Sequence, residues 1–208
     1  MAELAVRHGA SSSKVRLVPL PVPSVPTVPV VHSVPTVLCL SRVTRLKGIA
    51  ELLAAFSLLS RDARLLIAND GNDVARIRAL VRAHPRRGRI ELLGAVPTER
   101  VSQLLAEADV VALPSLWPEP FGLVGIEALA AGKPVVASGT GGMNEWARPE
   151  LGVIVAVPND ARSFAAALER ALAEPQWVDR ARTVGRDHVS RHHSLPAHDA
   201  ALVAAFEN

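Results

Sequence analysis

Short apolar runs alternate with longer amphipathic segments along most of this chain. The segments between the runs carry apolar residues at helical spacing, which predicts helices packed on one side. The six runs that predict strands are Val37–Leu40, Arg64–Ala68, Arg89–Leu93, Ala108–Leu113, Pro134–Ala137 and Gly152–Val155. Strands that alternate with helices in this way predict an α/β fold, a doubly wound parallel sheet in a single Rossmann-like domain.

Five helices are predicted around these strands, and two more follow them. The five are Ile49–Ser60, Val74–Ala83, Glu99–Glu107, Gly122 to Gly132 and Ala161–Ala173. Thr98 and Asp160 are expected to be N-caps, because their side chains can accept hydrogen bonds from the first turn of a helix. Residues 176–193 and 195–206 are predicted to be helical with no strand between them.

Residues 1–36 have a different pattern. Ala2–His8 predicts a short amphipathic helix and Val15–Leu20 a strand. Six prolines then fall between Pro19 and Pro35, a density that excludes a helix or a central strand and predicts an extended linker. The predicted organisation is therefore residues 1–36, a main domain over 37–175 and C-terminal helices over 176–208.

Composition limits the kind of protein. With 49% apolar and 21% charged residues, the 208-residue chain is typical of a globular protein. A net charge of +3 with no dense basic block argues against nucleic-acid binding. Cys39 is the single cysteine, which excludes an internal disulfide and favours a reducing compartment. Neither a signal peptide nor a run of ~20 apolar residues is found, so we expect a cytoplasmic protein.

The stretch Leu113–Val136 carries the main candidate chemistry. It runs from strand through a proline-broken loop into a helix and a second strand, and ligands bind at the carboxyl ends of strands in such sheets. Backbone N–H groups at Phe121–Val124 would face an anion there. Glu119 and Glu127 could bind ligand hydroxyls, although either acid alone is also consistent with an ordinary helix carboxylate. Paired acids occur in glycosidases too, but such a site has no use for the adjacent cations and helix N-terminus.

Two loops offer further candidates. In SRVTRLKG, Arg42 and Lys47 could neutralise phosphate, or they could be solvated surface charges. This loop lacks both the dinucleotide fingerprint and the P-loop pattern. The glycine-rich loop 139–145 could let the backbone approach a ligand or could be a flexible connection. His188, His192 and His193 lie at helical spacing without a complete set of metal ligands, so a polar helix face is favoured over a metal site.

Together these segments resemble the C-terminal, donor-binding domain of GT-B glycosyltransferases, most closely the retaining family 4 (glycosyl transferases group 1). The resemblance covers about Val37 to Ala173. Its segments are SRVTRLKG, NDGND, LLGAVP and ADVVALPSLWPEPFGLVGIEALAAGKPVVASGTGGMNE. The sequence EPFGL, with a second Glu after seven residues, is the most specific of these.

The resemblance implies a nucleotide-diphosphate sugar as donor, transferred with retention and with no cofactor or required metal. Arg42 and Lys47 would bind the diphosphate. Glu119 would bind hydroxyls of the sugar and Glu127 the ribose. The backbone at Val96 would contact the base. Backbone N–H groups of Phe121, Gly122 and Leu123 would bind phosphate and sugar.

The chain departs from the family pattern where Ser41 and Asn69 replace glycines. The resemblance also implies that residues 1–20 are the end of a first domain and that residues 195–206 would cross to it. We therefore expect self-association or a partner chain at residues 195–206. The alternatives are a non-catalytic nucleotide-sugar-binding or scaffolding subunit, and a sugar-nucleotide epimerase, against which EPFGL argues. The base, the sugar, the acceptor and any peripheral membrane attachment stay open.

Overall fold

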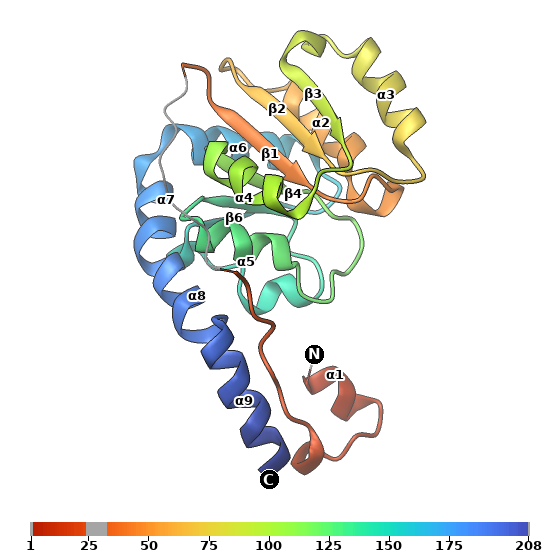
Figure 1. The fold of residues 1–208 in the computed structure, drawn as a ribbon. Coiled ribbons are helices and arrows are strands. Elements are labelled where there is room, and N and C mark those ends of the chain that lie inside the picture. The colour runs from red at the N-terminus through yellow and green to blue at the C-terminus, as the bar shows by residue number, and fades with distance from the viewer. Residues whose placement is uncertain (1, 24–32, 208) are drawn as a thin grey trace.

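The computed structural model describes residues 2–23 and 33–207, and its centre is one sheet of six parallel strands (Figure 1). The strands are β1 (Thr36–Leu40), β2 (Arg64–Ala68), β3 (Ile90–Gly94), β4 (Val110–Leu113), β5 (Val135–Ala137) and β6 (Val153–Val155). They are arranged in the order β3-β2-β1-β4-β5-β6. The predicted fold class and all six predicted strands are confirmed, with their ends shifted by no more than two residues.

The order of the strands reverses between β1 and β4. From β1 the chain adds β2 and β3 on one side of the sheet, and it then returns to pair β4 with β1 and continues outward to β6 on the other side. The loops that follow β1 and β4 therefore leave the sheet in opposite directions and open a crevice between them.

Helices cover both faces of the sheet. The helices α2 (Ile49–Ser57), α3 (Val74–Ala83) and α6 (Ala161–Ala173) pack on the face that buries Val37 and Cys39. The helices α4 (Thr98–Glu107), α5 (Leu123–Ala130) and α8 (Arg186–His192) pack on the face that buries Leu38 and Leu40. Burial on both faces explains why the strands are continuous apolar runs.

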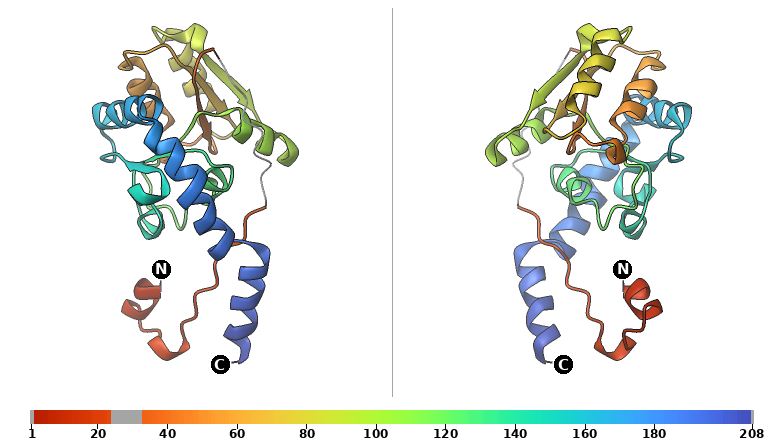
Figure 2. Two further views of the ribbon diagram at one scale, coloured as in Figure 1. Left: turned by 90° about the vertical axis from the view of Figure 1, so that its left-hand side faces the viewer. Right: turned by 90° about the vertical axis from the view of Figure 1, so that its right-hand side faces the viewer.

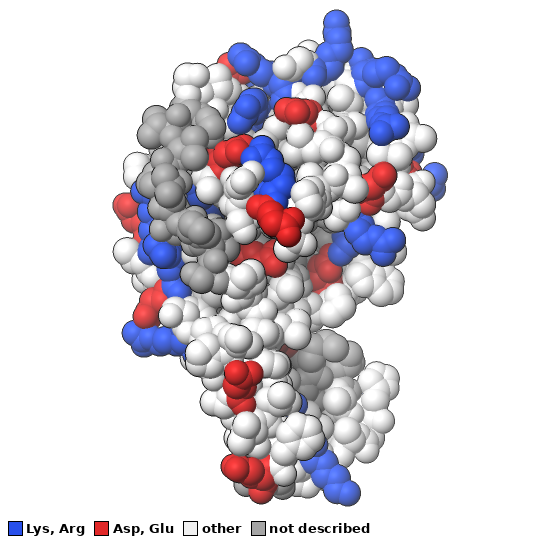
Figure 3. Space-filling view, in the orientation of Figure 1, with Lys and Arg blue, Asp and Glu red and all other residues white. Residues whose placement is uncertain are grey.

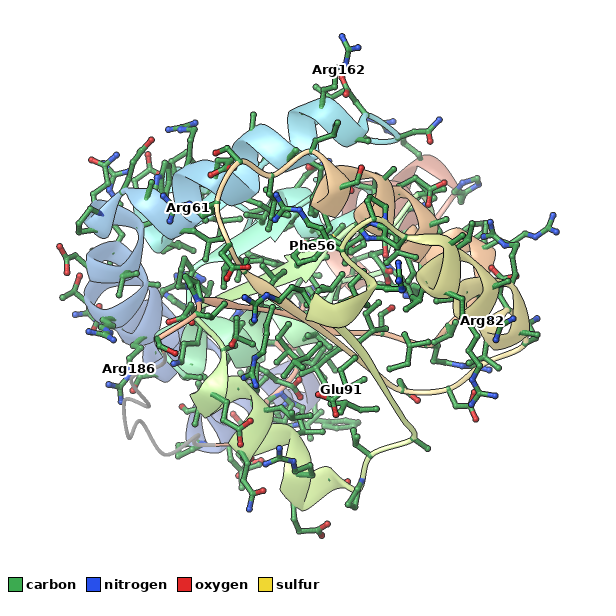
Figure 4. All side chains as sticks on the ribbon, turned by 90° about the horizontal axis from the view of Figure 1, so that it is seen from above. Phe56, Arg61, Arg82, Glu91, Arg162 and Arg186 are labelled. Atoms are coloured by element: carbon green, nitrogen blue, oxygen red, sulfur yellow. The ribbon has the colours of Figure 1, made fainter. Side chains whose placement is uncertain are left out.

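The charged side chains lie around this core. Phe56 of α2 points into the interior, whereas Arg82 and Arg162 point outward (Figure 4). On the face shown in Figure 3, Lys and Arg side chains gather at the upper end of the body and acidic side chains lie among basic ones below. No helix in residues 2–23 and 33–207 is long and apolar enough to cross a membrane.

Two helix ends differ from the sequence expectation. Thr98 was expected to be an N-cap, but it is already the first residue of α4 and Pro97 takes the cap position without a side-chain bond. The helix α2 ends at Ser57, three residues early, because the backbone N–H and the hydroxyl of Ser60 bond to Glu169 of α6. Asp160 is confirmed as an N-cap, since its Oδ1 accepts from Arg162 N at 2.9 Å and Ser163 N at 3.0 Å.

The C-terminal region is helical, as predicted. The helix α7 (Pro175–Arg180) continues through a π-helical turn at Ala181–Gly185 into α8, and α9 (Leu195–Glu207) follows after a short break. The helix α9 projects from the α/β body together with the N-terminal segment, as all the ribbon views show (Figure 2).

The N-terminal segment contains α1 (Ala2–Arg7) and a 3-10 turn at Ser12–Lys14. The strand predicted over Val15–Leu20 is wrong, because these residues pair with no strand and instead lie against the C-terminal helices. Val22 N donates to His193 O at 2.8 Å, and the ring nitrogens of His193 and His198 bond to the carbonyls of Leu20 and Pro19. Most of the predicted proline linker lies outside the described residues.

Candidate functional site

A pocket of about 150 Å³ lies where the strand order reverses, at the carboxyl ends of β1 and β4. Its lining comes from the ends of both strands, from the 3-10 turn at Arg45–Lys47 and from the start of α5. The lining residues are Leu40, Ser41, Lys47, Leu113, Pro114, Ser115, Glu119, Gly122, Leu123, Val124 and Met143. This is the position in which open α/β sheets bind ligands.

Gly48 brings the loop after β1 against the loop after β4. Its φ of +66° is in the left-handed region, and a Cβ at this position would lie 1.8 Å from Pro114 O. Leu46 O also accepts from Leu116 N at 2.9 Å. The two loops therefore form one packed unit that places Lys47 at the entrance to the crevice.

Lys47 and Glu119 form an ion pair in this pocket. The Lys47 ammonium and the Ser115 hydroxyl both donate to Glu119 Oε1. The Glu119 side chain is 12% exposed and that of Lys47 27% exposed, so the pair is shielded while its cation still reaches solvent. The sequence reasoning did not propose Ser115, although its place directly after a buried strand could have indicated it.

The glycine-rich loop supports Glu119 from behind. Glu119 and Gly141 form a parallel bridge, and Gly142 N donates to Glu119 O at 2.6 Å. A Cβ on Gly142 would lie 1.9 Å from Pro120 O. The close backbone approach that these glycines allow is therefore to the loop that carries Glu119.

The start of α5 faces the pocket with its backbone. Gly122 precedes the helix with a φ of +80°, and Leu123 and Val124 open its first turn. N–H groups in the first turn of a helix have no partner within the helix and carry the positive end of its dipole. A cation and a set of backbone donors thus converge on one small space that suits an anion.

Phe121 faces a different direction. Its carbonyl accepts from Trp146 Nε1 at 2.7 Å, and its ring centroid lies 5.4 Å from that of His193. Of the predicted site residues, the structure brings Lys47, Glu119, Gly122 and Leu123 together in the pocket lining, and it places the side chain of Phe121 outside that lining.

Three other predicted residues also lie outside the lining. The side chain of Arg42 is exposed, and that of Val96 is partly buried against the core on the face of the sheet that buries Leu38 and Leu40. Glu127 is half-buried on α5, where burial raises the pKa of its carboxyl. The structure gives the Glu127 carboxylate no hydrogen-bond or ion-pair partner among the described residues.

The two replaced glycines are accommodated locally. Asn69 adopts a φ of +114°, its N–H donates to Gly94 O at 2.7 Å, and its Oδ1 accepts from Asp70 N at 2.8 Å. Asn tolerates positive φ better than most residues. Ser41 lines the pocket and its N–H bonds to Ala68 O at 3.2 Å.

The histidine cluster has a structural environment. The rings of His188 and His192 lie 4.7 Å apart, and those of His188 and His193 5.8 Å apart. Burial, with the nearby histidines and Arg148, lowers the pKa of His188 to about 4. Within the described residues no group of three or more His, Cys, Asp or Glu side chains could hold a metal ion.

A Rossmann-like domain with its pocket at the strand-order reversal is the architecture of a GT-B glycosyltransferase domain, and solved GT-B structures share it. Residues 28–188 match the sequence pattern of the family described as Glycosyl transferases group 1, so the chain belongs to this family.

Individual relatives agree with this assignment. The chain is 34% identical over 163 residues to alpha-maltose-1-phosphate synthase of Mycolicibacterium smegmatis. The aligned region covers 73% of this chain and 41% of that protein. It is 32% identical to sucrose-phosphate synthase of Thermosynechococcus elongatus, with a TM-score of 0.77 over 84% of this chain and 45% of the other. Anabaena HepE in complex with UDP and glucose shares the fold, with a TM-score of 0.75 at 24% identity over 83% of this chain and 48% of the other. The chain spans less than half the length of each of these proteins.

Proposed function

We propose that this chain is the donor-binding domain of a retaining glycosyltransferase that uses a nucleotide-diphosphate sugar. The observation that carries the proposal is the convergence of Lys47, Glu119 and the first turn of α5 on one pocket. A diphosphate needs cations and N–H donors, and a sugar needs hydrogen-bond acceptors for its hydroxyls. The HepE structure, solved with UDP and glucose, supports UDP as the first nucleotide to test.

In this proposal Lys47 stabilises the diphosphate as negative charge develops on it during bond cleavage. Glu119 accepts hydrogen bonds from hydroxyls of the transferred sugar, and the N–H groups of Gly122 and Leu123 bind phosphate or sugar oxygens. With the positive end of α5 and Lys47 already present, the domain needs no metal ion or other cofactor to neutralise the diphosphate.

Residues outside the pocket lining would contact the nucleoside. Glu127, half-buried and available, would accept from the ribose hydroxyls, and the backbone near Val96 would meet the base. The exposed Arg42 would turn toward the diphosphate when it binds. Phe121 would contribute its backbone N–H, since its side chain lies on the other side of the loop.

The acceptor side of the reaction would need a second unit. Four of the fourteen exposed large hydrophobic side chains in the described residues lie on α9, which has 13 residues. They are Leu195, Leu202, Val203 and Phe206. An uncovered apolar surface of this kind marks an interface. We propose that residues 195–206 bind a second copy or a partner chain, and a clean monomer in sedimentation at high concentration would contradict self-association.

Calorimetric titration with UDP, GDP, ADP and dTDP tests the donor site. One nucleotide should bind. Lys47→Ala should lower the affinity for this nucleotide at least about tenfold, because losing a charge-assisted hydrogen bond costs about 1.5–3 kcal/mol. Glu127→Ala should weaken binding as well, whereas Lys14→Ala, an exposed lysine distant in sequence, should not. If none of the four binds, the donor-site proposal fails. Binding without sugar transfer in the presence of acceptor and partner would favour the non-catalytic subunit.

A further inference from the structure

The two oxygens of the Glu119 carboxylate have different environments. Oε1 accepts from both the Lys47 ammonium and the Ser115 hydroxyl, whereas Oε2 accepts no hydrogen bond from the residues that the structure describes. Among those residues, Glu51 Oε2 is the one fully buried side-chain oxygen or nitrogen without a partner, so Glu119 Oε2 still touches solvent. Glu119 lines the pocket between β1 and β4. One oxygen is therefore anchored, and the other has no protein partner.

The backbone on both sides of Ser115 is fixed. Leu113, two residues earlier, ends β4, and Leu116 N, one residue later, donates to Leu46 O at 2.9 Å. Ser115 itself is only 5% exposed. A single side-chain torsion places the serine oxygen on this fixed backbone. Its hydroxyl therefore stays beside Glu119.

Lys47, the second donor to Oε1, can change partners. Its side chain is 27% exposed, and its ammonium is carried on a flexible four-carbon stem. In the proposed function this ammonium binds the diphosphate, which attracts a cation more strongly than one carboxylate does because it carries more negative charge. Binding of the donor then draws Lys47 away from Glu119, while Ser115 keeps its hydrogen bond.

We propose that Ser115 is a positioning residue, which holds the Glu119 carboxylate toward the transferred sugar after the diphosphate has engaged Lys47. The inference rests on the proposed function. The Glu119 side chain is only 12% exposed, and a charged group shielded from water needs a hydrogen-bond partner. Without Ser115, the carboxylate would follow Lys47 or turn toward solvent. In both cases Oε2 would leave the sugar hydroxyls.

The affinity of the chain for a nucleotide sugar, relative to its affinity for the nucleotide alone, tests this inference. Calorimetric titration with UDP, GDP, ADP and dTDP, and with the glucose conjugate of each, gives that affinity ratio without acceptor or partner. Ser115→Ala should lower the ratio about tenfold, equivalent to about 1.4 kcal/mol, because the sugar hydroxyls lose a well-placed acceptor. The affinity for the nucleotide alone should be unchanged, since Ser115 bonds to Glu119 both before and after the nucleotide binds.

A pair of variants of equal shape separates the hydroxyl from packing. Ser115→Thr keeps the hydroxyl donor and Ser115→Val replaces it with a methyl group, so the bulk added at this buried position is the same in both. The affinity ratio should be about tenfold higher in Ser115→Thr than in Ser115→Val. Equal ratios in the two variants would overturn the inference.

Two further comparisons distinguish positioning from a general structural role. In a Glu119→Ala background, Ser115→Ala should leave the affinity ratio unchanged, because a residue that acts through Glu119 then has nothing to position. Ser138→Ala is the matched control, because Ser138 is also buried at the end of a strand but lies outside the pocket lining. This variant should keep the ratio of the unmodified chain.

The outcomes separate this inference from the proposed function. The role of Ser115 would be overturned, with the donor site still standing, if a nucleotide binds but Ser115→Ala leaves the affinity ratio unchanged. An equal fall of the ratio in Ser138→Ala, or a fall that persists in the Glu119→Ala background, would overturn it too. If none of the four nucleotides binds, the donor-site proposal itself fails.

Discussion

Lys47 and Glu119, 72 residues apart in the sequence, form an ion pair across the crevice between β1 and β4. The pair joins the two loops that leave the sheet in opposite directions. The Glu119 carboxylate is therefore paired with the same cation that, in the proposed function, binds the diphosphate. If the proposed function is right, a bound diphosphate competes with Glu119 for Lys47.

Glu119→Gln should bind UDP more tightly but transfer sugar more slowly. Removing the competing carboxylate frees Lys47, and a partly exposed ion pair contributes up to about 1 kcal/mol, or roughly a fivefold gain in affinity. Sugar transfer should slow down because the hydroxyls of the donor sugar lose the carboxylate that accepts their hydrogen bonds. Calorimetry and a donor-consumption assay with the partner present measure the two effects. Ser115→Ala keeps both charges and serves as the control for UDP binding, and weaker UDP binding by Glu119→Gln would contradict the competition.

Gly142→Ala should destabilise the fold and weaken nucleotide binding together. The new Cβ would lie 1.9 Å from Pro120 O, which forces the loop that carries Glu119 to move. Overpacking of this kind costs about 1–3 kcal/mol. Gly88→Ala is the matched control, because a Cβ there meets nothing within 4 Å. Urea unfolding and UDP titration of both variants provide the comparison, and equal behaviour would refute a packing role for Gly142.

Stability should fall as the pH is lowered from about 6.5 to about 4. Folding lowers the pKa of His188 from 6.5 to about 4, so over this interval the unfolded chain binds a proton that the folded chain does not. Four nearby charged or titratable side chains also act on the pKa of His188. Those of His192, His193 and Arg148 lower it, and that of Asp187 raises it. Urea unfolding at several pH values should show a shallower decline for His188→Gln than for the unmodified chain. The exposed His8→Gln should follow the unmodified chain, and a decline as steep in His188→Gln would contradict the assignment.

Cys39 should be unreactive in the folded protein. The residue is fully buried in β1, and burial raises the pKa of its thiol to about 12 although the charge of Lys47 opposes this. Because the thiolate is the reactive form, an aromatic disulfide reagent at pH 8 should label the chain only as fast as it unfolds. Labelling in denaturing urea is the positive control. Rapid labelling without denaturant would show that β1 opens locally.

Much of the fold followed from local pattern. The strands were predictable because both faces of a parallel sheet are buried, which leaves continuous apolar runs such as Leu65–Ala68. Asp160 was predictable because an N-cap acts on the residues that follow it directly. Thr98 failed as a cap because Pro97, one residue earlier, already provides the extended conformation that a cap position needs.

Long-range contacts decided what local pattern could not. The segment Val15–Leu20 has the composition of a strand, but its carbonyls meet His193 and His198 and no sheet edge. The helix α2 ends early because Glu169, 109 residues from Ser60, takes the hydrogen bonds of that residue. Both outcomes depend on residues that are distant in the sequence.

The sequence by itself determined the alternation of strands and helices, the residue types at the pocket between β1 and β4 and the family to which the chain belongs, because periodicity and motif spacing are local properties. Only the tertiary structure paired Lys47 with Glu119 and added Ser115 to them. It also turned Phe121 away from the pocket between β1 and β4 toward a cavity that residues 17–20 of the N-terminal segment also line. The direction of a side chain depends on which backbone lies against it, and here that backbone comes from parts of the chain far apart in sequence.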